Sequence, residues 1–123
     1  MAAPNLIAAT AIYGKTTGTN LTSTSATTVL NNASSSGKCL KVNTLNVANY
    51  GAVAANITVN FNNAANLGGT NFSIVNTVSV PAYSTLNVID KTSQYYLEEN
   101  QSLGATAGTA NTLIVTCSYE DIS

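Results

Sequence analysis

Hydrophobic and polar residues alternate with a period of two along much of this chain. The clearest runs are Ile57–Asn62 and Leu113–Tyr119, where every second side chain is apolar. A third run, Phe72–Val80, also alternates over most of its length. Such alternation is typical of strands with one buried and one solvated face. The apolar residues expected on one face of the third run are Phe72, Ile74, Val78 and Val80.

Further strand candidates lie between these runs, and turn-forming Asn, Gly and Pro residues separate them. In the candidate strand Leu40–Ala48 the alternation of apolar residues slips by one between Val42 and Leu45. One extra residue there, a β-bulge, would restore the alternation. The pattern predicts an all-β protein, an antiparallel β-sandwich of about eight strands with jelly-roll or immunoglobulin-like order. The further candidates are Leu6–Tyr13, Leu21–Leu30, Leu40–Ala48, Thr85–Ile89, Tyr95–Leu97 and Leu103–Ala107.

A chain of 123 residues is close to the commonest domain size, so we expect a single domain. Residues 17–123 are expected to form the sandwich. Residues 1–16 are expected to form either its first strand or an N-terminal arm that reaches a neighbouring molecule. The Thr- and Ser-rich run Thr16–Thr28 fits an edge strand with a polar outer face or a mobile loop, and we favour the strand.

Charged residues are scarce: there are four Lys, five carboxylates and no His, with a net charge of −1. Nucleic-acid binding requires a cationic surface that neutralises several phosphates, and anionic membranes require the same. We therefore expect no nucleic-acid partner and no membrane partner. The opening Met1–Asn5 has no cationic region followed by an apolar stretch, so no secretory signal is predicted.

The residue types also argue against catalysis. Without His, the chain has no Ser–His or Cys–His pair, no imidazole metal ligand and no imidazole general base. Glu98 and Glu99 are adjacent, so on a strand they would point to opposite faces instead of converging on a substrate. We expect no catalytic residue, no metal and no cofactor, and a protein that is not an enzyme.

Cys39 and Cys117 are the two cysteines of the chain. One disulfide is formally possible, but without a secretory signal we expect two reduced, partly buried thiols. Cys117 is in phase with Leu113 and Val115 and should face the core. Cys39 is out of phase with its apolar neighbours, which disfavours a direct pairing.

Tyr95 and Tyr96 are adjacent aromatic residues next to the acidic turn. The simpler interpretation places one of them in the core and the other at a sheet edge. Tyr is also favoured at interfaces because it combines apolar area with a polar tip. The alternative is therefore a contact patch for a protein partner or a neutral glycan.

Three stretches carry a resemblance to a known group of proteins. Val78–Ile89 contains "V-P-A" and leads into Tyr95–Leu103, which contains "Y-L-E-E", and the chain closes with Leu113–Ile122. This layout resembles small virion structural proteins of tailed bacteriophages, particularly marine and cyanobacterial ones. The opening Met1–Leu6, followed by Ile12–Thr16, is similar too. The resemblance implies a capsid- or tail-associated structural protein that is present in many copies.

The leading hypothesis is a decoration (cement) protein that binds the outer phage capsid and stabilises it. Its partners would be the major capsid protein or other virion proteins, and it would form a homo-oligomer, with a trimer as the first expectation. It would be located in the virion, assembled in the host cytoplasm. The alternative is a tail, fibre or head-knob module that contacts host surface glycans. The candidate interaction residues are Leu6, Ile7, Ile12, Tyr13, Tyr95 and Tyr96.

Overall fold

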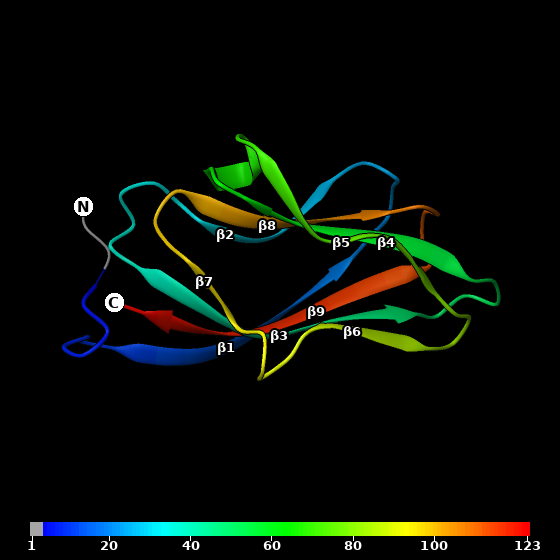
Figure 1. Ribbon diagram of the computed structural model, residues 1–123. Helices are drawn as coiled ribbons and strands as arrows, with labels where there is room; N and C mark the ends of the chain where they lie inside the picture. The colour runs from blue at the N-terminus through cyan, green and yellow to red at the C-terminus, as the bar shows by residue number, and fades with distance from the viewer. Residues whose placement is uncertain (1–3) are drawn as a thin grey trace.

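The alternating runs form strands, and the strands form two antiparallel sheets that pack face to face (Figure 1). The computed structural model describes residues 4–123. The expected β-sandwich is thereby confirmed. Within residues 4–123, no helix has the length and apolar character needed to cross a bilayer. The elements are β1 (Ile12–Asn20), β2 (Thr27–Asn32), β3 (Cys39–Asn49), β4 (Ala55–Asn62), the short 3₁₀ helix η1 (Ala65–Leu67), β5 (Asn71–Val80), β6 (Thr85–Ile89), β7 (Tyr95–Leu97), β8 (Gln101–Ala107) and β9 (Leu113–Ile122).

The strand order is that of a jelly roll. Sheet A has the order β1-β9-β3-β6, with β7 pairing with the other part of β3, and sheet B has the order β2-β8-β4-β5. The pairs are nested along the chain: the first strand pairs with the last, the second with the eighth, the third with the sixth and seventh, and the fourth with the fifth. An immunoglobulin-like sandwich would instead distribute its strands as ABED and CFG. Of the two orders expected, the structure has the jelly roll.

The core lies between the sheets and contains the apolar side chains of the alternating runs. Leu45, Ile57, Leu103 and Val115 are fully buried there. The pairing of β3 with β9 shifts register between Val42 and Thr44, which confirms the expected bulge. Because one extra residue is accommodated at this bulge, the apolar residues on both sides of it point into the same core.

Strand β5 does not keep a single alternating register. Its pairing with β4 shifts twice, and Thr77 within it has a positive φ of 52°. As a result Ile74 and Val75 both pack against the core. Phe72, which was expected on the apolar face, is 52% exposed and lies 6.0 Å from the ring of Phe61.

The N-terminal region differs from the expected strand Leu6–Tyr13. Strand β1 begins at Ile12, and a turn closed by the hydrogen bond from the Ala8 N–H to the Asn5 carbonyl oxygen precedes it. The N–H groups of Thr10 and Ala11 then donate to the carbonyl oxygen of Ser123. Residues 16–20 of the Thr- and Ser-rich run belong to β1, which is an edge strand of sheet A. For these residues the favoured edge strand is confirmed.

The second part of the Thr/Ser run, residues 21–26, is not a strand and connects sheet A to sheet B. Two hydroxyl groups bind nearby backbone: the N–H of Ser25 donates to Ser23 Oγ, and Thr27 Oγ1 donates to the Ser25 carbonyl oxygen. Such local bonds compete with strand pairing. Leu21 is buried in the core at the start of this connection.

Candidate functional site

Large apolar side chains are exposed at the end of the molecule where the C-terminus and the start of β1 lie (Figure 1). Four of them are the N-terminal residues singled out from the sequence, and we call this group the N-terminal apolar patch. Leu6 and Ile7 precede β1, whereas Ile12 and Tyr13, as successive residues of β1, point to opposite faces of sheet A. Thr10 and Ala11 connect the patch to the C-terminal Ser123 through backbone hydrogen bonds, so the segment follows the body of the sandwich. The exposed fractions are 46% for Leu6, 97% for Ile7, 56% for Ile12 and 60% for Tyr13.

The two adjacent tyrosines point to opposite faces of sheet A. Tyr95 pairs with Val42 and packs against the core, whereas Tyr96 pairs with Lys41 and is exposed on the outer face. The simpler interpretation of this pair is therefore confirmed, and Tyr95 does not contribute to an exposed contact patch.

Tyr96 belongs to the same cross-strand row as Gly14 of β1. The row runs from Gly14 through Glu120 and Lys41 to Tyr96, a distance of three strand spacings or roughly 14 Å. Lys41 Nζ lies 3.7 Å from Glu120 Oε2 in the middle of the row. At this end of the molecule, the outer face of sheet A therefore carries Ile12 on the β1 edge and Tyr96 on the β7 edge.

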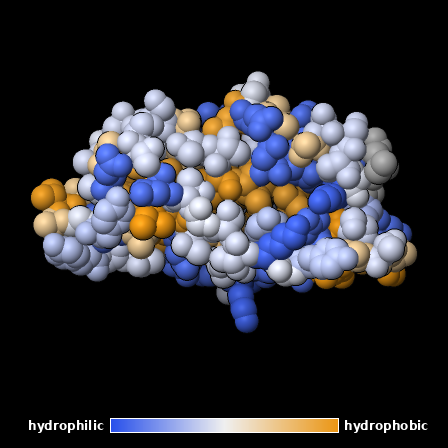
Figure 2. All heavy atoms as spheres, turned by 180° about the vertical axis from the view of Figure 1, so that it is seen from behind, coloured by the Kyte–Doolittle hydropathy of each residue, from blue (hydrophilic) through white to orange (hydrophobic). Residues whose placement is uncertain are grey.

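A second group of exposed apolar residues lies at the opposite end of the sandwich. It consists of Tyr50, Val53 and Tyr83, and the sequence analysis did not single it out. The buried side chain of Asn49 holds two loops there, because its Nδ2 donates to the carbonyl oxygens of Val53 and Val80. Figure 2 shows orange apolar atoms at both ends of the molecule and along the middle of the face in view, among mostly pale and blue surface.

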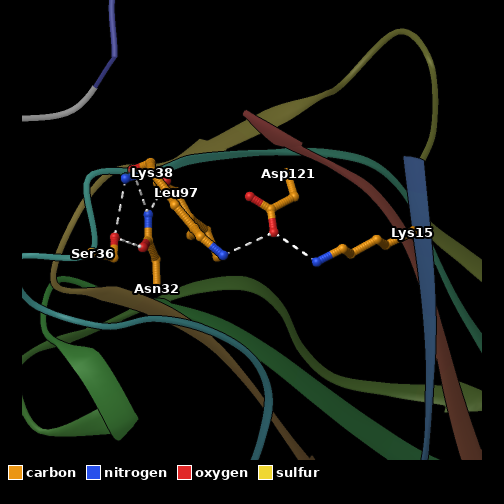
Figure 3. A network of polar contacts seen from close by, with 6 residues as sticks. All are labelled: Lys15, Asn32, Ser36, Lys38, Leu97 and Asp121. Carbon is orange, nitrogen blue, oxygen red and sulfur yellow. Dashed lines mark hydrogen bonds and ion pairs between the residues drawn. The ribbon is translucent and has the colours of Figure 1, made fainter. Parts of the chain in front are cut away.

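An ion network centred on the buried Asp121 lies close to the C-terminus (Figure 3). Asp121 of β9 is 7% exposed, and its Oδ2 accepts hydrogen bonds from Lys15 Nζ at 2.8 Å and from Lys38 Nζ at 3.2 Å. The sequence analysis missed this network. A signal was available, because continuing the period of Cys117 and Tyr119 places Asp121 on the inward face, where a carboxylate needs partners.

The two lysines determine the ionisation of Asp121. Burial opposes the charged form of Asp121, but the hydrogen bonds and positive charges of Lys15 and Lys38 outweigh burial and lower the pKa of this carboxyl group. The pKa of Lys15 is raised in turn, first by its hydrogen bond to Asp121 and then by the charge of that residue. Both partners are therefore ionised over a wide range around neutral pH.

This network borders a pocket with a volume of about 280 Å³. The lining combines the charged groups with the amides of Asn31 and Asn32, the Ser36 hydroxyl, the Tyr119 ring and two leucines, Leu30 and Leu40. Asn32 is itself buried: its Nδ2 donates to the carbonyl oxygens of Lys38 and Leu97, and its Oδ1 accepts from Ser36 Oγ at 2.5 Å. The β2–β3 loop is thus fixed in place along one side of the pocket.

Cys39 and Cys117 are both buried and both free in the structure. Cys117 faces the core as predicted, and burial raises its pKa to about 12. Burial, and to a lesser degree the charge of Glu98, also raises the pKa of Cys39. Since the thiolate is the nucleophilic form, neither side chain is activated for covalent chemistry. Within residues 4–123, no three His, Cys, Asp or Glu side chains form a group that could hold a metal ion.

The fold and the site define the class of this protein: it is a jelly-roll β-sandwich with few charges, a network of buried polar side chains, and exposed apolar residues at its two ends. No protein-family model matches the chain, and a comparison with curated proteins finds no similar sequence. Its functional assignment therefore depends on the sequence patterns and on the geometry given above.

Proposed function

We propose that this chain is a non-enzymatic structural protein of a phage virion, a decoration protein that binds the outside of the capsid and stabilises it. The major capsid protein, or another virion protein, is its partner, and the virion, assembled in the host cytoplasm, is its location. The observation that carries the proposal is the N-terminal apolar patch, in which Ile7 is 97% exposed. Four large apolar side chains that are exposed within the short segment from Leu6 to Tyr13 offer anchors to a partner protein.

The fold and the surface support the same proposal. Jelly rolls occur in viral capsid and lectin domains, although a fold does not by itself fix a function. The surface carries few ionised groups, so contacts with a shell require little desolvation of charge. A protein that binds only the assembled shell stabilises that shell by mass action, and many weak contacts repeated over a lattice reinforce one another.

The test of this proposal compares the two apolar ends of the sandwich. Replacing Ile7 and Ile12 by serine is expected to weaken binding to shells stripped of this protein by at least about tenfold, because two exposed anchors are lost. The matched control replaces Val53 and Tyr83 by serine at the opposite end. Binding is measured by co-sedimentation with the shells, and circular dichroism checks that both variants are folded. Unchanged binding of the Ile7/Ile12 variant would contradict the assignment of the patch.

The alternative function, a tail, fibre or head-knob module that contacts host glycans, is favoured by the pocket beside Asp121. Its buried carboxylate, two ammonium groups and Tyr119 ring offer the hydrogen bonds and the flat apolar face that a sugar ring uses. A volume of about 280 Å³ suits one small ring rather than a longer ligand.

A glycan array probed with the labelled protein separates the alternative from the capsid proposal. If the alternative holds, the wild-type protein binds a defined set of glycans, and Lys38→Met reduces that signal by at least about tenfold. Glu120→Gln, which changes the opposite face of β9, serves as the control. A protein that binds no glycan but retains shell binding would exclude the alternative.

A further inference from the structure

Strand β1 is an edge strand of sheet A, and no register shift interrupts its pairing with β9. Its nine residues pair with β9 from Ile12 opposite Ile122 to Asn20 opposite Ile114 without a register shift. Of the other edge strands, β2, β5 and β6 each have at least one shift in their pairing, and β7 has no shift but only three residues. Bulges, prolines and outward charges are the usual devices that prevent edge-to-edge pairing. Strand β1 has no bulge and no proline.

The one charge on β1 does not protect its edge either. Lys15 directs its ammonium group to Asp121 of its own chain, at 2.8 Å. The ammonium group is therefore held against its own chain and is not projected over the free edge of β1. A net charge of −1 for the whole chain adds little repulsion between two copies.

Two glycines of β1 have no explanation within the chain. Gly14 and Gly18 do not have positive φ, and no described atom lies within 4 Å of a Cβ built on either of them. Glycine in the interior of a strand weakens it, and often marks a place where another backbone approaches closely. Both glycines belong to the outer face of sheet A, together with Thr16 between them.

The hydrogen-bond pattern shows which backbone groups point away from β9. Ala11 and Ser123 exchange both of their backbone hydrogen bonds, and the N–H of Leu21 donates to Leu113. Since hydrogen-bonded and non-hydrogen-bonded pairs alternate in an antiparallel ladder, the odd-numbered residues of β1 face β9. The residues that point their N–H and C=O groups to the free edge are Ile12, Gly14, Thr16, Gly18 and Asn20.

We propose that the free edge of β1 pairs with the same edge of a second copy of this chain, antiparallel and with the two-fold axis at Thr16. In this register Thr16 faces Thr16 of the second copy, and Gly14 faces Gly18. The five edge-facing residues then form hydrogen-bonded pairs, with up to about ten hydrogen bonds in all. Tyr13 lies across from Thr19, a favourable aromatic–Thr pair, and Lys15 lies across from Thr17.

This contact has a consequence for assembly that does not depend on the proposed function. A two-fold contact uses the same surface on both copies and closes as a dimer. It therefore predicts a dimer in place of the trimer expected from the sequence. A single strand pair buries less surface than the roughly 1,200–2,000 Å² of a standard stable interface, so the dimer should dissociate on dilution.

Residue 16 provides a direct test, because the proposed register places it opposite itself. Sedimentation equilibrium over a range of concentrations should show wild-type protein approaching twice 12.6 kDa. Thr16→Lys and Thr16→Glu, each alone, should raise the dissociation constant at least tenfold, because like charges then face each other. An equimolar mixture of the two variants should form a heterodimer, because the two charges are then opposite.

Two further variants separate edge pairing from general effects. Thr16→Pro removes an outward N–H without removing a bond to β9, and should also prevent dimer formation. Thr116→Lys, on the outer face of the neighbouring strand β9, should leave the dimer unchanged. A wild-type protein that stays monomeric at every concentration, a mass of three chains, or a Thr16→Lys variant that dimerises like the wild type would each overturn the proposal.

Discussion

Replacing Asn62 by alanine is expected to lower the free energy of unfolding by about 3 kcal/mol. Asn62 is fully buried at the end of β4, and its amide group uses all of its hydrogen-bonding capacity. Its Nδ2 donates to the Gly69 carbonyl oxygen and to Asn71 Oδ1, and its Oδ1 accepts from the N–H groups of Ala64 and Gly69. The alanine variant removes the four hydrogen bonds that hold the loop between β4 and β5 and leaves a cavity in place of the buried amide.

Urea denaturation followed by circular dichroism measures this loss. The matched control is Asn87→Ala on β6, where the side chain is exposed and a change within about 0.5 kcal/mol is expected. Equal stabilities for the two variants would show that the loop between β4 and β5 contributes nothing to the cooperative fold. A loss confined to the Asn62 variant would support the contribution of the amide bonds.

Replacing Asp121 by asparagine is expected to destabilise the protein by about 1–2 kcal/mol at neutral pH. The carboxylate is buried and accepts charged hydrogen bonds from Lys15 and Lys38, but both ammonium groups are partly exposed, so solvent replaces part of the lost interaction. Stability is again measured by urea denaturation, at a series of pH values.

The pH dependence of this effect has a definite sign. The folded-state pKa of Asp121 is lowered, so its contribution to stability is complete above the ordinary carboxyl value of 3.8 and is lost as the pH falls through the folded value. The difference between wild type and Asp121→Asn should therefore be constant near neutral pH and decrease in acid below about pH 4. The control Glu120→Gln changes the other face of the strand and should shift stability by no more than about 0.5 kcal/mol. A difference that persists unchanged to pH 2 would contradict the role of the ion network.

The raised pKa of Lys15 sets the alkaline end of the pH range in which this ion pair stabilises the fold. A cation whose folded pKa is raised contributes stability below its ordinary value of 10.5, and the contribution is lost as the pH rises through the folded value. The network is thus intact from moderately acid to strongly alkaline solution.

Several features of the candidate site followed from local patterns. Leu6, Ile7, Ile12 and Tyr13 are exposed, although Leu6–Tyr13 was expected as a strand and only Ile12 and Tyr13 belong to one. The opposite orientations of Tyr95 and Tyr96 follow from the two-residue period of a strand. The period could not reveal which strand lies beside β7, so the row from Gly14 to Tyr96 came only from the pairing of β3 with both β7 and β9.

Other residues acquired their roles from contacts far along the chain. Asn62 and Ser102 occupy outward positions of sheet B, where the alternating pattern predicts contact with water. They are buried because the loop around η1 folds over them: Ser102 Oγ donates to the Ala64 carbonyl oxygen and accepts from the Leu67 N–H. Likewise, 106 positions separate Lys15 from Asp121, and only the pairing of the first strand with the last brings them together.

The sequence by itself determined the all-β class, most of the strands, the bulge in β3 and the inward position of Cys117, because each depends on the two-residue period of a strand and on residue types within a short span. The tertiary structure alone decided the jelly-roll order, the buried Asp121 network and the continuous free edge of β1. These features depend on which strands become neighbours, and that choice is made by the burial of the shared core and by distant backbone pairing, which a local pattern does not encode.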